Sequence, residues 1–190
     1  LFLIGIFYNS WLLGLGAILG TVISTLSAKL LRYSNREIED GLYGFNGTLT
    51  GIAVCCFFEP TILALFGLII ASFLSTWLMN TLKKMLPPFT APFVIVTWLV
   101  LSIFIFGLNV PLLPSASSVE ETFKLFQVTG KSFGQVMIQN HAITGLFFFL
   151  GILINQKMMA IYALYAAILG SLLGWFLQVD LTSINSGLMG

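Results

Sequence analysis

The chain has 190 residues, of which 58% are hydrophobic, 14% aromatic and only 8% charged. Because soluble domains carry roughly 25% charged residues, this composition excludes a water-soluble globular domain and indicates an integral membrane protein. The formal net charge of +1 provides no basic field for nucleic acid, so no nucleic-acid partner is expected.

The apolar runs predict helices rather than strands. Several of them are much longer than the ~10 alternating residues of a membrane β-strand. Residues 1–8 are interpreted as the end of one apolar helix, and residues 11–31 are long enough to cross a hydrocarbon core of about 30 Å. The segment 32–40 holds the densest cluster of charges and is expected to turn at the membrane surface.

An unusual segment, "GLYGFNGTLTG" at residues 41–51, follows this turn. Four of its eleven residues are glycine, and an asparagine stands beside an aromatic residue. Irregular or half-length backbone survives in a bilayer only where it is buried in protein or lines a cavity. This segment is therefore the first place to look for a transport pathway.

The remaining elements follow in order. Residues 61–82 are predicted to span, three prolines break the chain at 85–93, and a helix is expected to continue over 94–106. Residues 108–131 form the longest polar stretch, in which "SSVEETF" predicts a capping-box start to a short surface helix. A further apolar run and a span over 158–177 bring the expected total to about five spanning segments.

The two ends of the chain resemble each other at a constant shift of 146 residues. The matched pairs are Gly5 with Gly151, Ile6 with Ile152, Asn9 with Asn155, Ile38 with Ile184, Gly41 with Gly187, and Leu42 with Leu188. We interpret residues 1–107 as most of a first repeat, 108–131 as a linker, and 132–190 as the incomplete start of a second repeat. A repeat with an odd number of spans inserts its second copy upside down, which is the inverted-repeat plan of many transporters.

The sequence provides little for catalysis, and no enzyme activity, cofactor or metal site is expected. It has one histidine and no HExxH, GxSxG, CxxC or phosphate-loop motif. The acidic and basic residues lie at segment ends or in loops, whereas ion coupling usually needs such groups within a span. A pathway of hydroxyl, amide, carbonyl and aromatic groups suits passive passage of a small neutral solute. A coupled transporter of another small polar solute and a non-transporting scaffold are the alternatives.

Three motifs together resemble the urea transporter family. They are "GLYGFNGTLTG", "LPPFTAPFVIVTW" and "GQVMIQNHAITGLFFFLGILI", in the family's order and at similar spacing over nearly the whole chain. The resemblance implies an all-α integral membrane protein with an inverted-repeat transporter or channel fold, in which each repeat has five spanning helices and a tilted half-helix. It also implies passive transport of urea or a close analogue, a homotrimer with one pore per subunit, and a multi-pass place among the lipids of the cell membrane, in bacteria the inner membrane. The chain would then begin in the second spanning helix of the first half and stop at the second copy of the glycine-rich segment.

By the same resemblance, Phe45 and Leu49 wall a flat slot, and the hydroxyl group of Thr90 faces the middle of the pore. Stacked aromatic faces admit a planar solute and exclude hydrated ions. The prolines on either side of Thr90, including Pro92, free carbonyl groups that can accept urea N–H groups. Thr90 can also cap the next helix, which is compatible with lining the pore. Asn46 is expected to hold the half-helix in place.

Gln135 matches a residue at the pore mouth that can accept from a urea amide, although it can instead satisfy backbone groups at a helix start. Asn140 lies in the neighbouring turn. The sequence departs from the family at Ile138, where a second slot aromatic is common, and at His141 and Ala142, where an asparagine and a proline are usual. The slot is therefore expected to be wider or less selective on that side. His141 is interpreted as an interfacial residue rather than a gate.

Overall fold

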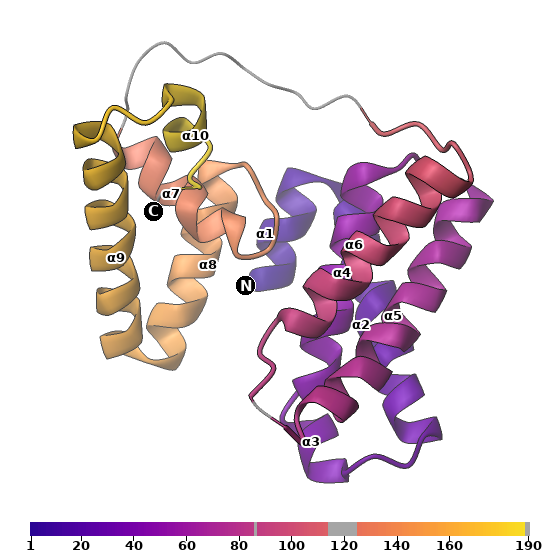
Figure 1. Cartoon of the computed structure of the whole chain (residues 1–190). Helices are drawn as coiled ribbons and strands as arrows, with labels where there is room; N and C mark the ends of the chain where they lie inside the picture. Colours follow the sequence, from indigo (N-terminus) through magenta and orange to yellow (C-terminus); the bar gives the residue numbers. More distant parts are fainter. Residues whose placement is uncertain (86, 114–124, 189–190) are drawn as a thin grey trace. The chain divides into compact units, whose positions relative to one another are not determined.

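The computed structural model describes residues 1–85, 87–113 and 125–188, and all regular structure within these ranges is helical (Figure 1). The elements are α1 (Phe2–Asn9), α2 (Trp11–Leu30), α3 (Asn35–Glu39), α4 (Leu42–Phe57), α5 (Ile62–Leu82), α6 (Ala91–Ser102), the π-helical turn η1 (Ile103–Gly107), α7 (Leu125–Gln135), α8 (Ala142–Asn155), α9 (Lys157–Phe176) and α10 (Leu181–Asn185). The chain divides into two compact units. We call Leu1–Trp11 with Ser115–Gly190 unit 1, and Leu12–Pro114 unit 2.

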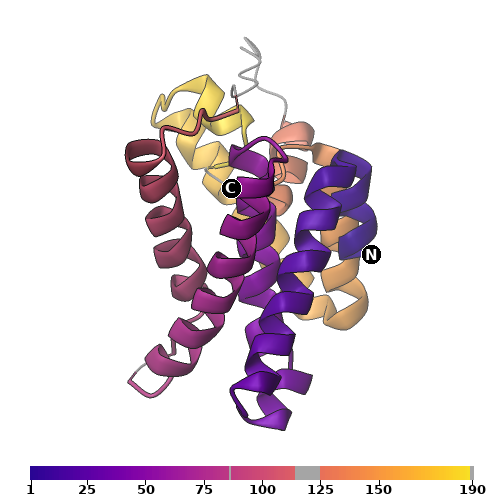
Figure 2. The same cartoon turned by 90° about the vertical axis from the view of Figure 1, so that its right-hand side faces the viewer.

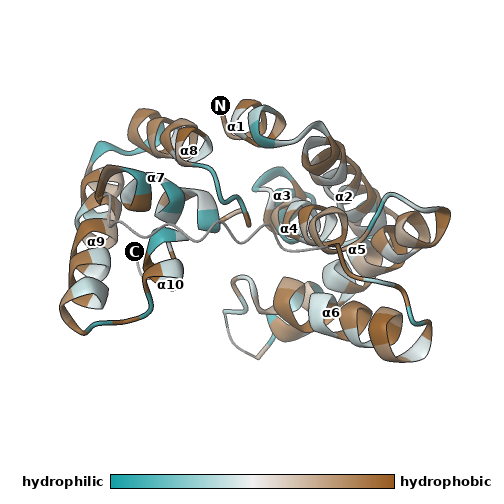
Figure 3. Cartoon of the chain, turned by 90° about the horizontal axis from the view of Figure 1, so that it is seen from above, coloured by the Kyte–Doolittle hydropathy of each residue, from teal (hydrophilic) through white to brown (hydrophobic). Residues whose placement is uncertain are grey.

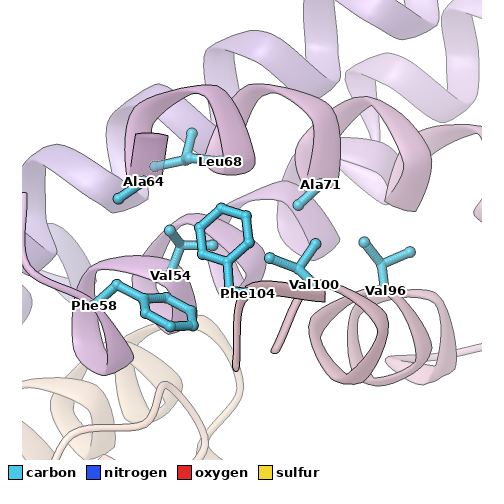
Figure 4. Close-up of a cluster of buried hydrophobic side chains, with 8 residues drawn as sticks. All are labelled: Val54, Phe58, Ala64, Leu68, Ala71, Val96, Val100 and Phe104. Atoms are coloured by element: carbon cyan, nitrogen blue, oxygen red, sulfur yellow. The ribbon is translucent and has the colours of Figure 1, made fainter. Parts of the chain in front are cut away.

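Unit 2 has its apolar core where α5 packs against α4 and α6 (Figure 2). The buried side chains that point toward one another there are Val54, Phe58, Ala64, Leu68, Ala71, Val96, Val100 and Phe104 (Figure 4). Phe104 comes from η1, and its ring would overlap a Cβ atom placed on Gly67. Thr61 starts α5 by accepting a hydrogen bond from the N–H group of Ala64, which satisfies one of the open donors of the first turn.

Glycines bring α2 and α4 into backbone contact. A Cβ atom on Gly20 would overlap the carbonyl oxygen of Gly47, and a Cβ atom on Gly51 would overlap that of Gly16. Each helix thus carries a G-x-x-x-G pattern, whose small residues let helix backbones approach closely in membranes. The glycine-rich segment is therefore not irregular. It forms the first part of a regular helix of 16 residues, and its glycines serve packing.

Unit 1 packs α8 against α1, α7 and α9. Helices α1 and α8 are antiparallel, because Phe2 contacts Gly151, whereas Gly5 accepts a hydrogen bond from Thr144 near the other end of α8. The rings of Phe2 and Phe148 stack with centroids 4.9 Å apart and planes inclined by 20°. A Cβ atom on Gly5 would lie 3.0 Å from the Phe148 ring, and one on Gly151 would lie 2.7 Å from the Phe2 ring. These contacts are reciprocal, because Phe148 lies 146 positions after Phe2 and Gly151 lies 146 positions after Gly5.

The local backbone structure also recurs at this shift. Helices α2 and α9 begin and end 146 residues apart, as do α3 and α10, and α1 and α8 end 146 residues apart. The backbone is left-handed at Arg32 and Gln178, and again at Gly41 and Gly187, and both pairs have the same separation. Arg32 and Gln178 each stand at the left-handed position of a Schellman motif that ends the preceding helix. The backbone therefore recurs even where the residues differ.

Three helices of the described ranges, α2, α5 and α9, are long and apolar enough to cross a membrane. They confirm the predicted spans over 11–31, 61–82 and 158–177, and Figure 3 shows hydrophobic residues dominating them. The predicted count of about five is too high for this part of the chain. The remaining apolar segments form shorter helices, which include Ala91–Gly107 and Ala142–Asn155.

The polar stretch after η1 ends in a helix. Helix α7 begins at Leu125, within the stretch where a linker with a short surface helix was predicted, and it continues to Gln135. Short side chains and apolar residues on one face allow this segment to pack against α8 despite its polar composition. The capping-box motif "SSVEETF" lies outside the described residues.

Candidate functional site

Unit 2 contains a cavity of about 450 Å³ where α4 meets the proline loop that precedes α6. Its walls are residues 40–42 of the α3–α4 turn, Phe45 and Asn46 of α4, Met79 of α5, and residues 87–90 of the loop. The side chain of Phe45 is 41% exposed, although most of its neighbours in α4 are buried. Two residues expected in a solute pathway, Phe45 and Thr90, therefore meet at one cavity.

Asn46 ties the proline loop to α4. Its side chain is 1% exposed, its Nδ2 donates to the carbonyl oxygen of Phe89 at 3.1 Å, and its Oδ1 accepts from the N–H group of Phe93 at 3.2 Å. Phe93 lies in the first turn of α6, whose N–H groups have no partner within the helix, and the carbonyl group of Phe89 lies before that helix. The amide of Asn46 stands between them. Phe89 itself has a positive φ of 45°, a conformation that this bond helps to hold.

Thr90 occupies the N-cap position of α6, but its side chain makes no capping hydrogen bond. Its hydroxyl group is therefore available at the cavity wall. Pro92 is buried in the first turn of α6, where the missing N–H group costs no helical hydrogen bond. The carbonyl oxygens of Pro88 and Phe89 already accept a backbone N–H group and the Asn46 amide, respectively, and each keeps a second lone pair.

Leu49 lies one turn after Phe45 and is only 2% exposed. The part of α4 that lines the cavity ends at Asn46. Unit 2 thus brings Phe45, Asn46 and Thr90 together, and it places Leu49 in the packed interior of the unit.

The other expected pathway residues belong to unit 1, around the end of α7. The Nε2 atom of Gln135 donates to the carbonyl oxygen of Ser186 at 2.7 Å, which gives this side chain a structural role at the end of α10. Ile138 has a positive φ of 57° and is the left-handed residue of the Schellman motif that ends α7. A β-branched residue is unusual in this conformation, where glycine or asparagine is preferred. Asn140 is exposed in the turn that follows.

Two further features, one in each unit, were missed at the level of sequence. Gln139 is completely buried: its Oε1 accepts from Asn9 at 2.6 Å, and its Nε2 donates to the carbonyl oxygen of Met137 at 2.9 Å. Its only sequence signal is the run of amides in "IQNH". The second feature is the ion pair between Glu37 and Lys83. From the sequence, both charges are expected at a membrane surface, but nothing indicates that they pair.

The chemistry at the cavity of unit 2 is mainly neutral. Among its described lining residues, Asp40 is the one with an ionisable side chain, and it is exposed in the α3–α4 turn. In the described ranges, no group of three or more His, Cys, Asp or Glu residues could hold a metal ion. The cavity can therefore present an aromatic face, a hydroxyl group and backbone carbonyl groups to a solute.

The family profile described as "Urea transporter" matches residues 1–190. Urea transporter 1 of Rattus norvegicus is 30% identical over 96% of this chain and 52% of its own length. The proteins of the same name from Capra hircus and Mus musculus are 27% and 29% identical, over 100% and 96% of this chain and 54% and 52% of their own lengths. The chain spans about half the length of these curated relatives.

The family match agrees with the motifs that meet at the cavity. The segments "GLYGFNGTLTG" and "LPPFTAPF" supply Phe45, Asn46 and Thr90, and both lie within the matched residues. The helical fold, with three helices able to cross a membrane, is that of a membrane protein. Because the profile matches every residue of the chain, the resemblance is confirmed, and the chain belongs to the urea transporter family.

Proposed function

We propose that the protein provides a passive, channel-like pathway for urea through a narrow slot that removes water from its solute. The observation that carries this proposal is the meeting of Phe45 and Thr90 at one mainly neutral cavity in a chain of the urea transporter family. An aromatic face can stack on a planar amide, and a threonine hydroxyl can donate to or accept from it. A hydrated ion would lose its water shell there without gaining a compensating charge.

The proposed pathway comprises Phe45, Leu49, Thr90, Gln135 and Ile138. Phe45 and Thr90 are supported by their shared cavity. Leu49 and Gln135 are included because they match the family motifs, and Ile138 because it stands where the family commonly has a second slot aromatic. Asn46, Pro92 and Asn140 are proposed as supporting residues. For Asn46 the support is its pair of hydrogen bonds to the loop that carries Thr90.

The alternative is a coupled transporter of another small polar solute. Coupling to protons or ions usually uses ionisable groups within the spans, and Asp40 at the cavity lies in an exposed turn instead. Backbone carbonyl groups alone can hold Na⁺, so the transport measurement described below decides between the two mechanisms.

We further propose that the chain contains parts of two inverted repeats, with residues 1–107 and 132–190 joined by 108–131. The recurrence of helix ends and left-handed residues at a shift of 146 supports the duplication. The antiparallel contact of α1 with α8 supports the inversion. Its reciprocal pairs, Phe2 with Gly151 and Gly5 with Phe148, are the contacts that a two-fold axis generates.

A homotrimer in the cell membrane completes the proposal. Large apolar side chains are exposed along α5 and α9, among them Phe66, Trp77, Tyr165 and Phe176. Such faces suit contact with lipid or with a neighbouring subunit. The bacterial inner membrane stays a prediction from the resemblance.

The test is urea transport by the full-length protein in proteoliposomes, followed by light scattering as a urea gradient shrinks and reswells the vesicles. We expect saturable urea flux that is unchanged when sodium, proton and voltage gradients are collapsed. Flux that stops without a gradient would instead establish the coupled mechanism. Folded protein that carries no urea at all would contradict the proposed urea pathway.

A further inference from the structure

Three side chains from three elements meet beside the cavity of unit 2. Glu37 comes from α3, Tyr43 from the first turn of α4, and Lys83 from the C-cap of α5. The hydroxyl group of Tyr43 lies 2.8 Å from the Glu37 carboxylate and 2.8 Å from Lys83 Nζ, and Lys83 forms an ion pair with Glu37. The three groups therefore close a triangle.

The hydrogen-bond donors and acceptors of these three side chains match one another. Lys83 can donate to both partners, the Tyr43 O–H group donates to the carboxylate, and Glu37 accepts from both. Asn80 offers Tyr43 a second acceptor at a longer distance of 3.3 Å. Charge-assisted hydrogen bonds of this kind are stronger and more directional than neutral ones. Lys83 Nζ also lies 5.4 Å from the centroid of the Tyr43 ring, within cation–π range.

The ring of Tyr43 anchors the triangle in the protein. Tyr43 is completely buried and packs with Ala28 and Met79, and its ring centroid lies 5.3 Å from that of Tyr33. Met79 lies one turn before Lys83 on α5 and is also part of the cavity wall. Met79 therefore contacts both Tyr43 and the cavity.

The three residues of the triangle are close in the chain to both rims of the cavity. One rim is the α3–α4 turn, residues 40–42, which connects Glu37 to Tyr43. The other rim is the loop 87–90, which follows Lys83 closely in the chain. Asn46 attaches this loop to α4 at its far end, but it does not bind the α3–α4 turn. The ion pair joins the two segments from which the rims extend.

We propose that Glu37, Tyr43 and Lys83 act as positioning residues that set the width of the cavity mouth and so determine which solutes enter. This inference rests on the proposed urea pathway through the cavity. The three residues do not contact solute; they act through the turn and the loop that they hold together. The electrostatic environment of Glu37, which lies outside the membrane-spanning helices, agrees with this role. The hydrogen bond from Lys83 lowers the pKa of Glu37 against the opposing effect of burial.

The test uses the full-length protein in proteoliposomes with three variants. Tyr43→Phe removes the shared hydroxyl group and keeps the ring, and Glu37→Gln removes the charge and keeps the shape. The exchange variant Glu37→Lys with Lys83→Glu restores a pair of opposite charges. Lys84→Met is the matched control, because Lys84 is the adjacent lysine and is exposed.

The first readout is the rate at which a maleimide labels Phe45→Cys, in a background without other reactive cysteines. We expect the rate to rise roughly three- to tenfold in Tyr43→Phe and Glu37→Gln, to return toward the parent value in the exchange variant, and to stay unchanged in Lys84→Met. The second readout is the ratio of urea flux to N,N′-dimethylurea flux, which should fall in the same two variants.

The outcomes separate this inference from the proposed function. An unchanged labelling rate in folded Tyr43→Phe and Glu37→Gln overturns the positioning role, whatever the fluxes are. If the parent protein carries no urea, the proposed pathway fails, and the labelling rates still decide whether the three residues set the width of the mouth. Equal losses of both fluxes with unchanged labelling would show a purely structural role and overturn the inference.

Discussion

The buried side chain of Asn46 donates a hydrogen bond to the carbonyl oxygen of Phe89, 43 residues farther along the chain. This bond joins two of the three motifs by which the sequence resembles the urea transporters. It also explains why an asparagine stands inside an apolar, glycine-rich helix. The amide satisfies two backbone groups that the proline-interrupted start of α6 would otherwise leave open.

Replacing Asn46 by alanine should destabilise the protein. The carbonyl group of Phe89 and the N–H group of Phe93 would lose their partner at a partly buried site, where each hydrogen bond typically contributes about 0.5–1.5 kcal/mol. Thermal unfolding in detergent should show a lower Tm for Asn46→Ala. Asn35→Ala, an exposed position at the start of α3, is the control and should leave Tm unchanged. Equal Tm values for the two variants would contradict the bridging role.

The crossing of α2 and α4 should tolerate no side chain at Gly47. A Cβ atom there would overlap Ser24 Oγ and the carbonyl oxygen of Gly20, so Gly47→Ala must push the helices apart. Overpacking of this kind typically costs about 1–3 kcal/mol. Gly107→Ala is the matched control, because the atom nearest to its Cβ would be 4.0 Å away. Yields of folded protein and Tm values measure the difference, and a Gly47→Ala variant as stable as Gly107→Ala would refute the close approach.

The ion pair of Glu37 predicts a pH dependence of stability. Because the hydrogen bond from Lys83 lowers the pKa of Glu37 in the folded protein, the carboxylate stabilises the fold above its unfolded pKa. That contribution is lost as the pH falls through the folded pKa. The Tm of the parent protein should therefore exceed that of Glu37→Gln at neutral pH, and the gap should close below about pH 4. A gap that persists in acid would mean that the charge is not its cause.

The charges of unit 2 predict its orientation in the membrane. Since α2, α4, α5 and α6 alternate in direction, the basic residues of the described part of unit 2 gather at one end. They are Lys29, Arg32, Arg36, Lys83 and Lys84. Glu59 lies at the opposite end. Because Lys and Arg accumulate on the cytoplasmic side, the cavity mouth should face the cytoplasm.

Cysteine labelling in intact cells measures this orientation. A membrane-impermeant thiol reagent added outside should label Glu59→Cys and should label Arg36→Cys only after the cells are opened. The reverse pattern would show that the cavity mouth faces outward.

The long helices could be predicted closely because an apolar run that ends at charged or polar residues has few other solutions in lipid. Helix α4 was harder. From the sequence alone, its glycines suggest an irregular segment. The structure shows that they allow close contact with Gly16 and Gly20 of α2. Helix α7 was missed in part because its polar composition hides the face that packs on α8.

The candidate site, too, has residues that could be predicted from the sequence and residues that could not. Phe45, Asn46 and Thr90 were found because they lie within two specific motifs, and the structure brings these three to one cavity. The interaction of Glu37 with Lys83 joins residues 46 positions apart and has no motif. These charges come together because α3 packs on α4 and α4 packs on α5, and sequence periodicity does not report such packing.

The most direct test of the central claim is urea flux through Thr90→Val in the full-length protein. The cavity wall would keep its shape and lose one hydroxyl group, so urea flux per folded protein should fall roughly fivefold, the worth of one hydrogen bond of about 1 kcal/mol. Thr81→Val, which removes an exposed hydroxyl group of the same unit, should conduct like the parent. An undiminished flux through folded Thr90→Val would contradict the claim that urea passes along this wall.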